Sequence, residues 1–306
     1  MKKITGTFLD EITWDIPSFN WGREEWRKEF DTFKQAGIDT VIIIRCALRD
    51  LAAFPSEVIG IKDVPDLVQL FLDEAERCGI KLFMGTWDSG VLEYKFERWR
   101  ENWVVTEKLI PELIDRYGTH PAFHGWYISP ETCVATDGAL EIFRRNSDLM
   151  KELTPEKPVL ISPYYPSWVY KEDSLEERHR RFRDDWVKIF SNAPHIDICA
   201  FQDGSCSFDI QCMEAAKELE EYVRDVHQVC REMNITMWNN VETFARNMPI
   251  KFPPIDWRLL KRKMAIADPY VEKHITFEFS HFLSPNSLYP SAQTLYKRYR
   301  EEISGE

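Results

Sequence analysis

Two patterns of apolar residues alternate along this chain. Short runs rich in β-branched and aromatic residues are typical of buried parallel strands, and longer stretches with an apolar residue every three or four positions are typical of helices. Eight such alternations follow one another from residue 4 to residue 302. The strand-like runs are 4–10, 39–45, 81–87, 123–131, 158–165, 196–203, 235–242 and 274–280.

Helical patterns fill the intervals between these runs. In the first of them, Trp26, Phe30 and Phe33 share one face, and Gly37 follows where helices commonly end in a left-handed residue. Gly79 follows the second helical pattern in the same way. Helices are expected over 24–36, 66–78, 102–117, 138–153, 175–190, 213–233, 256–267 and 291–302.

Eight strand–helix units predict an α/β fold, a single (β/α)8 TIM barrel that forms one domain over residues 1–306. Helix-to-strand connections are short, whereas strand-to-helix connections are long, as in barrels that build an active site at the C-terminal ends of the strands. An open doubly wound sheet is the alternative. The sequence favours it less, because it contains no GxGxxG or GxxxxGK[ST] motif.

Two glutamates end strand-like runs, Glu131 the fourth and Glu242 the seventh. In a barrel these positions face each other across the mouth, and glycosidic bond cleavage requires two carboxyl groups flanking the bond. A separation of about 5–5.5 Å supports a retaining mechanism, and about 6.5–9.5 Å an inverting one. By strand number we interpret Glu131 as acid/base and Glu242 as nucleophile or base, within about 10 Å of each other.

Side chains alternate between the two faces of a strand. In the fourth and seventh runs this alternation directs both glutamates into the barrel mouth. In the eighth run it predicts that Thr276 and Glu278 point inward and Phe277 outward. In the sixth run the pattern leaves open whether Gln202 or Asp203 points inward.

Further polar and aromatic side chains end or closely follow strands. Carboxylates, amides and arginine bind sugar hydroxyls or shift the pKa of a neighbouring carboxyl, and aromatic rings stack on the C–H faces of sugars. Eleven tryptophans are a high count for this length. The substrate-binding residues we expect are Asp10, Trp14, Arg45, Trp87, Asp88, Tyr164, Tyr165, Gln202, Asp203, Trp238, Asn240, Glu278 and His281.

Several phrases of the sequence resemble a bacterial family of uncharacterised barrel proteins, classed only as candidate glycoside hydrolases. They are GTFLDEITWD, AGIDTVIII, HGWYISPE, LISPYY, AFQDG and WNNVETF. The resemblance implies the barrel fold and a carbohydrate substrate. The strand-end glutamates also resemble the large retaining clan of barrel glycosidases, but Pro130 stands where that clan commonly has an asparagine, so the resemblance does not imply a stereochemical outcome.

Composition narrows the function classes. A net charge of −12, without a basic run, opposes nucleic-acid binding, and no apolar run approaches the roughly 20 residues that span a membrane. The seven cysteines form no CxxC pair, and Met1-Lys2-Lys3 is followed by strand-like sequence rather than a secretory signal, so we expect a cytoplasmic protein. No cofactor motif occurs, and the oligomeric state is not indicated.

Two other functions fit the same residues. One is a metal-dependent sugar isomerase or lyase, with Glu131, Asp203, Glu242, Glu278 and His281 as candidate ligands. A bound divalent ion or activity sensitive to EDTA would favour this alternative. The other is a non-catalytic carbohydrate-binding barrel, which would keep the aromatic residues without holding the glutamates at reacting distance.

Overall fold

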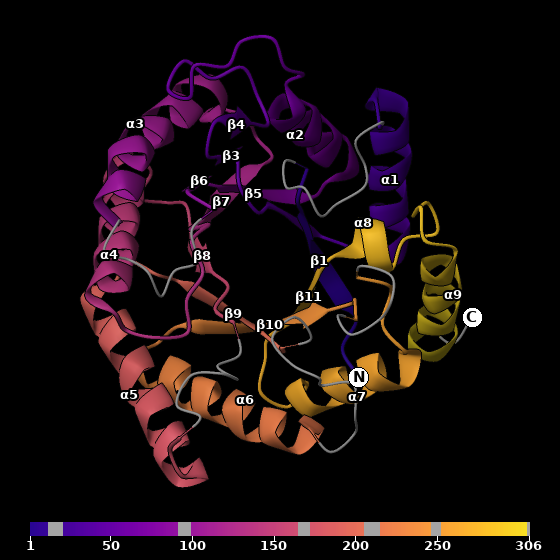
Figure 1. Ribbon diagram of the computed structural model, residues 1–306. Coiled ribbons are helices and arrows are strands. Elements are labelled where there is room, and N and C mark those ends of the chain that lie inside the picture. The colour runs from indigo at the N-terminus through magenta and orange to yellow at the C-terminus, as the bar shows by residue number, and fades with distance from the viewer. Residues whose placement is uncertain (12–20, 91–98, 165–171, 205–214, 246–251, 305–306) are drawn as a thin grey trace.

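Eight parallel strands close into a barrel (Figure 1), in the order β1-β11-β10-β9-β8-β7-β5-β2. The structure, a computed structural model, describes residues 1–11, 21–90, 99–164, 172–204, 215–245 and 252–304. The predicted TIM-barrel fold is confirmed, and every strand begins within two residues of its expected start. The barrel strands are β1 (Ile4–Leu9), β2 (Thr40–Ile43), β5 (Lys81–Gly85), β7 (Phe123–Tyr127), β8 (Val159–Ile161), β9 (Ile198–Gln202), β10 (Thr236–Glu242) and β11 (His274–Phe277).

Helices surround the barrel as an outer ring (Figure 1). Gly37 and Gly79 end the first two in the left-handed conformation, with φ of 85° and 72°, as the sequence predicted. All eight expected helices are present, with ends within three residues of the prediction. They are α1 (Arg23–Ala36), α2 (Leu67–Cys78), α3 (Trp99–Tyr117), α4 (Asp137–Leu153), α5 (Leu175–Asn192), α6 (Ala215–Glu232), α7 (Trp257–Ala267) and α9 (Pro290–Ser304).

Two apolar layers hold these elements together. The larger layer fills the space between the barrel and the helices, and includes Trp26, Phe30 and Phe33 of α1. A smaller group, here called the interior cluster, fills the barrel itself, as is usual for this fold. Its members are Phe8, Ile42, Ile44, Phe83, Tyr127, Leu160, Ile198, Ala200, Trp238 and Ile275.

The side chains of strand β11 alternate between the two faces in the opposite phase to the one predicted. Ile275 belongs to the interior cluster and Phe277 packs against it, so Thr276 lies on the outer face, where its hydroxyl donates to the Val241 carbonyl at 2.6 Å. The expectation that Thr276 points inward and Phe277 outward was wrong. Helices cover the outer face of a parallel barrel and side chains fill its interior, so alternation of apolar and polar residues does not distinguish the two faces.

Strand β9 settles the question that its pattern left open. Ile198 and Ala200 lie in the interior cluster, which places Gln202 on the inner face and Asp203 on the outer face.

Four short elements were not predicted as such from the sequence. The strands β3 (Ala47–Leu48), β4 (Leu51–Ala52) and β6 (Trp87–Asp88) form a small sheet in the order β4-β3-β6. The short helix α8 (Phe279–Phe282) follows β11 directly. The small sheet connects the loops after the second and third barrel strands, and therefore fixes the part of the mouth to which Asp88 belongs.

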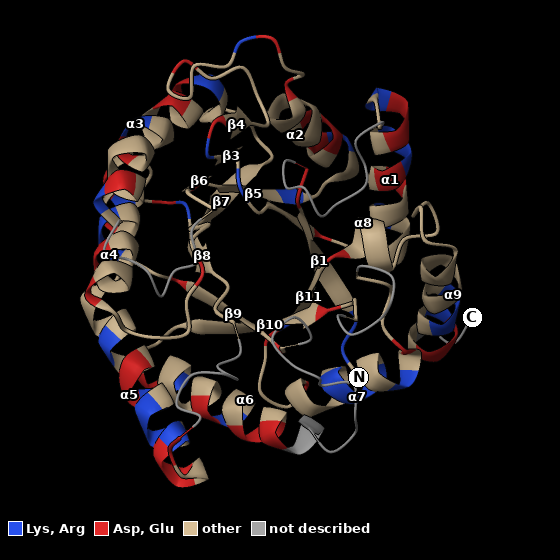
Figure 2. Cartoon of the chain, viewed as in Figure 1, with Lys and Arg blue, Asp and Glu red and all other residues tan. Residues whose placement is uncertain are grey.

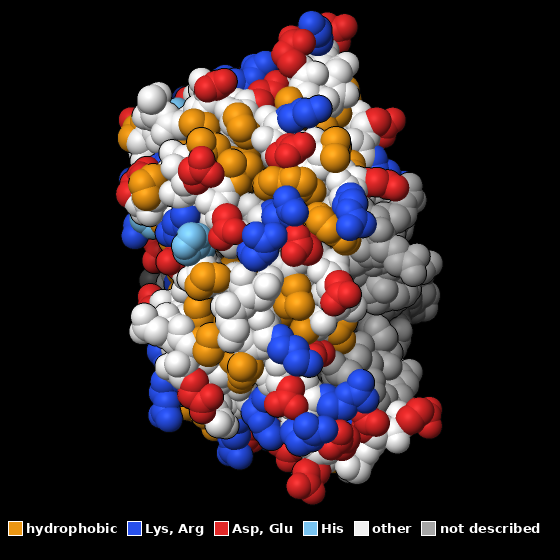
Figure 3. Space-filling model, turned by 90° about the vertical axis from the view of Figure 1, so that its left-hand side faces the viewer, with side chains coloured by type: hydrophobic (Ala, Val, Ile, Leu, Met, Phe, Trp, Pro, Cys, Tyr) orange, Lys and Arg blue, Asp and Glu red, His pale blue; other side chains and the backbone are white. Residues whose placement is uncertain are grey.

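Charged residues concentrate on the outer helices, whereas the barrel strands carry few (Figure 2). Figure 3, which views the side of α3, α4 and α5, shows hydrophobic side chains distributed among charged ones. Exposed examples on these helices are Val104, Leu153, Leu175 and Val187, and isolated apolar residues of this kind are normal on a protein surface. Within the described ranges, no helix is long and apolar enough to cross a membrane.

Candidate active site

Glu131 lies just beyond the C-terminal end of β7, four residues after Tyr127. The Tyr127 hydroxyl donates to Glu131 Oε1 at 3.0 Å, and the Gln202 side chain also hydrogen-bonds to this carboxyl. Because Tyr127 belongs to the interior cluster, the carboxyl of Glu131 lies above the filled centre of the barrel. Burial raises the pKa of Glu131 above its ordinary value, and hydrogen bonds from Gln202 and Tyr127 and the charge of Arg45 offset only part of that rise.

Arg45 joins the ends of three neighbouring strands beside Glu131. Its guanidinium lies 2.5 Å from Asp88 and 3.7 Å from Asp10. Burial opposes the charged form of Arg45, but the charges of Asp10, Asp88 and Glu131 outweigh that effect and raise its pKa. We call Asp10, Arg45 and Asp88 the Arg45 cluster. The negative charges of its two aspartates offset much of the positive charge of Arg45. Arg45 therefore lowers the pKa of Glu131 only in part, and the effect of burial prevails.

Glu242 is the last residue of β10, and 3% of it is exposed. Its backbone is held from the side of β9, where the N–H donates to Asp203 Oδ1 at 3.1 Å and the carbonyl accepts from Lys263 Nζ at 2.8 Å. Trp238 on the same face belongs to the interior cluster, so alternation directs the Glu242 side chain toward the barrel axis.

A set of polar side chains connects the strand that carries Glu242 to the partner of Glu131. Gln202 Nε2 donates to the Ser162 carbonyl at 2.8 Å, and Asn240 Nδ2 donates to Ser162 Oγ at 3.0 Å. Asn240 pairs with Gln202 across β9 and β10 and lies on the same face as Glu242, about 6.6 Å below it. We call Ser162, Gln202 and Asn240 the polar bridge.

Glu278 and His281 lie on the β1 side of the mouth. Glu278 is fully buried at the start of α8, and its Oε2 accepts from the backbone N–H of Asp10 at 3.2 Å. His281 Nδ1 contacts Glu278 Oε1. The buried carboxylate thereby connects β11 to the Arg45 cluster through Asp10.

Three residues predicted to bind substrate lie away from the mouth. Trp238 lies in the barrel interior near its N-terminal end, with Lys273 Nζ 4.9 Å from its ring. Trp87 packs in the layer between barrel and helices, and its Nε1 donates to the Arg49 carbonyl at 2.9 Å. Asp203 points out of the barrel toward α7.

The remaining predicted residues divide between described and undescribed parts. Tyr164 follows β8 and is partly exposed. Trp14 and Tyr165, both predicted to contact substrate, lie outside the described residues.

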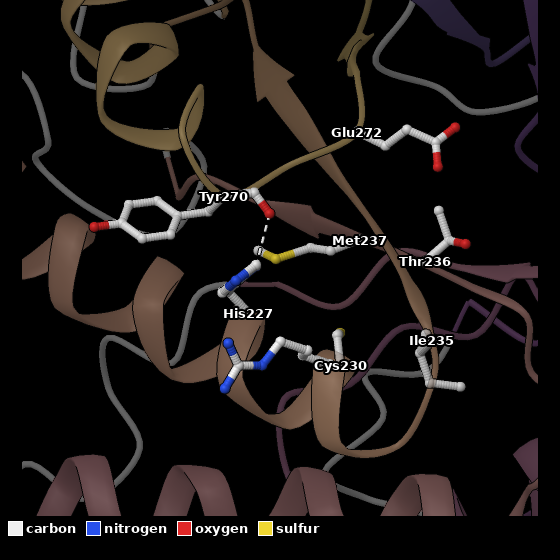
Figure 4. Close-up of a pocket in the computed structure, with 8 residues that line it drawn as sticks. His227, Cys230, Ile235, Thr236, Met237, Tyr270 and Glu272 are labelled. Atoms are coloured by element: carbon white, nitrogen blue, oxygen red, sulfur yellow. Dashed lines mark hydrogen bonds between the residues drawn. The ribbon is translucent and has the colours of Figure 1, made fainter.

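A pocket of about 180 Å³ lies at the other end of the barrel (Figure 4). It involves α6, the first residues of β10 and the segment before β11, and His227 Nδ1 and the Tyr270 carbonyl are 2.8 Å apart at its edge. Thr236 and Met237 line it, whereas Glu242 lies at the opposite end of the same strand. We therefore locate the chemistry by the strand-end carboxylates rather than by this pocket.

Metal binding has no support in the donor geometry. Within the described ranges, no group of three or more His, Cys, Asp or Glu side chains is arranged to hold a metal ion. Nothing in the donor set therefore favours the metal-dependent alternative over the glycosidase.

Comparison with known proteins assigns the chain to a family. The sequence matches the model of the family described as "Domain of unknown function (DUF4434)" over residues 4–289. The chain belongs to this family. Comparison with curated proteins gives no match.

A solved structure from Bacteroides thetaiotaomicron, described as a "putative alpha-L-fucosidase", is similar to this DUF4434 protein over its whole length. The two sequences are 36% identical, and the TM-score is 0.86 over 100% of this chain and 94% of that chain.

More distant structural neighbours of this DUF4434 protein are glycoside hydrolases. The endo-β-1,4-mannanase of Thermotoga petrophila has a TM-score of 0.65 at 13% identity, over 100% of this chain and 78% of that chain. A GH2 β-galacturonidase of Eisenbergiella tayi has a TM-score of 0.64 at 14% identity, over 98% of this chain and 51% of its own. At such identities the likeness concerns the fold alone.

Three residues that form or support the mouth of this DUF4434 protein were not predicted from its sequence. Tyr127 was not among the predicted site residues, although its position four residues before Glu131 was a usable signal. Ser162 directly follows β8, in phase with Leu160 of the interior cluster, and could have been found in the same way. Lys263 lies within a helix, 60 residues from its partner Asp203, and no local pattern indicates it.

Proposed function

We propose that this protein is a glycoside hydrolase in which Glu131 is the general acid/base and Glu242 the nucleophile or base. The observation that carries the proposal is the hydrogen bond between Glu131 and Gln202. Gln202 pairs with Asn240, which precedes Glu242 by two residues on the same face of β10. Glu131 contacts the polar bridge directly, and Glu242 follows its Asn240 on the same strand face. This placement supports two carboxyl groups that would flank a glycosidic bond at the mouth.

The environment of Glu131 suits a general acid. A carboxyl whose pKa is raised by burial keeps its proton closer to neutral pH and can transfer it to the departing sugar oxygen. After that transfer, the hydrogen bonds from Gln202 and Tyr127 and the charge of Arg45 stabilise the carboxylate. Tyr127 also fixes the direction in which Oε1 presents itself.

Glu242 would attack the anomeric carbon directly or activate a water. The Glu242 backbone is held at both N–H and carbonyl, which limits the positions that its carboxylate can adopt. Attack from the face opposite Glu131 gives a covalent glycosyl intermediate if the carboxyls are close, and room for a water if they are farther apart.

The other polar groups of the mouth would bind sugar hydroxyls. We assign this role to the Arg45 cluster, to Gln202 and Asn240, and to Tyr164 at the rim. Glu278 would hold the backbone of Asp10 in place through its hydrogen bond to the Asp10 N–H, and His281 would hold Glu278. Trp87, Trp238 and Asp203 are left out of the substrate-contacting set because their side chains pack in apolar layers or point away from the mouth.

The 36% identical relative, described as a "putative alpha-L-fucosidase", suggests which substrate class to try first. We therefore propose α-L-fucosides as the first candidates in a wider panel of glycosides. The mannanase and the galacturonidase share only the fold and do not narrow the choice of sugar.

Screening the protein against aryl glycosides and natural oligosaccharides tests the proposal. Glu131→Gln and Glu242→Gln should each lower kcat by about 10²- to 10⁴-fold while circular dichroism and melting temperature stay near those of the wild type. Glu272→Gln is a matched control, because Glu272 is exposed at the opposite end of the barrel.

The outcomes separate the competing functions. Wild-type turnover in either folded mutant would refute the assignment of the pair. Tight sugar binding with no turnover in the wild type would favour the carbohydrate-binding barrel, and activity abolished by EDTA would favour a metal enzyme. Proton NMR of the first-formed anomer would distinguish retention from inversion.

A further inference from the structure

The backbone of Glu242 extends beyond the end of its neighbouring strand. In a strand, the N–H and C=O of one residue point to the same neighbour, and for Glu242 that neighbour is β9. The pairing of β9 with β10 ends at Gln202 and Asn240, followed by one more backbone hydrogen bond from Asp203 N–H to the Asn240 carbonyl at 3.2 Å. At Glu242, no strand among the described residues remains on that side to bind its backbone groups.

Two side chains take the place of the missing strand. The carboxylate of Asp203 accepts from the Glu242 N–H at 3.1 Å, and the ammonium of Lys263 donates to the Glu242 carbonyl at 2.8 Å. The two side chains are themselves 2.6 Å apart, from Lys263 Nζ to Asp203 Oδ1. They therefore continue the hydrogen-bonding pattern of the sheet by one residue, at the position of the glutamate.

The burial of this ion pair argues against a purely stabilising role. The side chains of Lys263 and Asp203 are 0% and 1% exposed. Removing two charges from water costs stability that their attraction often does not recover, and apolar residues of similar volume commonly stabilise a fold at least as well. What an apolar pair could not supply is an acceptor and a donor directed at one backbone unit.

We propose that Lys263 and Asp203 are positioning residues that hold the backbone of Glu242 and thereby aim its carboxylate. The effect on catalysis rests on the proposed function. The claim that the two residues hold the backbone of Glu242 does not depend on it. Neither residue touches substrate, because Asp203 points out of the barrel and Lys263 reaches it from helix α7 on the outside.

The test uses the double variant Lys263→Met/Asp203→Asn. Removing Lys263 alone would leave a buried unpaired carboxylate and could prevent folding, whereas the double variant leaves no charge at either of the two buried positions. The change Asp203→Asn keeps a side-chain oxygen that can accept from the Glu242 N–H, but without the charge of the carboxylate. The change Lys263→Met removes the donor to the Glu242 carbonyl. The matched control is Lys261→Met/Glu302→Gln, which removes an exposed ion pair between α7 and α9.

Amide hydrogen exchange of a peptide spanning Glu242 provides a measurement that needs no substrate. We expect the Glu242 amide to exchange roughly tenfold faster in the double variant than in the wild type or the control. The charge-assisted hydrogen bond from the Glu242 N–H to the Asp203 carboxylate becomes a weaker neutral one, and the Glu242 carbonyl loses its donor. Exchange at the wild-type rate in the folded double variant would overturn the positioning role, whatever the activity of the protein.

Kinetics provide the second measurement. With a substrate from the panel, kcat should fall about 10- to 100-fold in the double variant while KM changes little, since a small displacement of a reacting group affects the transition state more than binding. Faster exchange with wild-type kcat would overturn the catalytic part of the inference. If the wild type turns over no glycoside, the proposed function fails, while the exchange comparison still decides whether the pair holds Glu242.

Discussion

Glu29 of α1 makes the stability of this protein depend on pH in a predictable direction. It is fully buried, and its Oε2 accepts from Ser284 and Asn286 at 2.8 Å each. Burial raises the pKa of Glu29 from 4.5 to about 7, despite these hydrogen bonds. The folded protein therefore holds the proton more tightly than the unfolded chain does.

The sign and size of the effect follow from linkage. Below pH 4.5 both states are protonated and the group has no effect on unfolding. Between pH 4.5 and 7 the unfolded chain ionises first, so the free energy of unfolding falls as pH rises, by up to about 3 kcal/mol for a shift of this size. Above that window the loss is complete.

Glu29→Gln removes this dependence. The amide oxygen can accept from Ser284 and Asn286, and the amide N–H can donate to the nearby hydroxyl of Ser280. We expect the variant to be more stable than the wild type at pH 7 by about 3 kcal/mol, and similar to it at pH 4. Urea unfolding followed by tryptophan fluorescence across this range measures the difference.

The control for this experiment is Glu24→Gln on the same helix, whose side chain is exposed. It should follow the wild-type curve at every pH. Parallel curves for Glu29→Gln and the wild type between pH 4.5 and 7 would refute the reasoning, as would a variant that is less stable at pH 7.

Two further substitutions test the barrel interior and its mouth. Tyr127→Phe removes a hydrogen bond that lowers the pKa of Glu131. The alkaline limb of the pH profile of kcat/KM should therefore move to higher pH. A limb that stays at the same pH or moves to lower pH would contradict the assignment of Glu131 as the acid. Its control is Tyr117→Phe, which removes a similar bond of 2.9 Å to Asp66 in the helix layer. Gly125→Ala places a methyl group 2.5 Å from the Phe83 ring, and thermal unfolding should show a loss of about 1–3 kcal/mol; wild-type stability would mean that Phe83 moves freely.

The number and order of the elements were predictable from the sequence, because each strand and helix carries its own apolar pattern. The small sheet formed by β3, β4 and β6 was not, since strands of two residues are too short to show a period. Helix α8 has four residues and escapes detection for the same reason.

The facing of individual strands was predictable only in part. The inner set of β10 agreed with the prediction, because Trp238 lies in the interior cluster. For β11 the prediction from the pattern was wrong. The bulky Phe277 fits inside the barrel beside Phe8, with 6.3 Å between the ring centroids. The small Thr276 lies on the outer face, where its hydroxyl donates a hydrogen bond to the Val241 carbonyl. Polarity alone does not predict such a choice.

Tryptophans predicted to line the mouth show a related difficulty. A residue near a strand end can lie in either apolar layer, and the sequence does not tell its height along the barrel axis. Trp238 is only four residues before Glu242, yet its ring lies beside Lys273 at the N-terminal end of the barrel.

The Arg45 cluster also bears on which sugars could enter. Two aspartates share one guanidinium, so the cluster carries an excess of negative charge, to which an ionised Glu242 would add. A uronic acid, whose own carboxylate would meet this field, has no uncompensated cation to receive it in the described part of the mouth. Neutral sugars such as fucosides would meet no such repulsion, and a comparison of a neutral glycoside with its uronide counterpart would measure the discrimination directly.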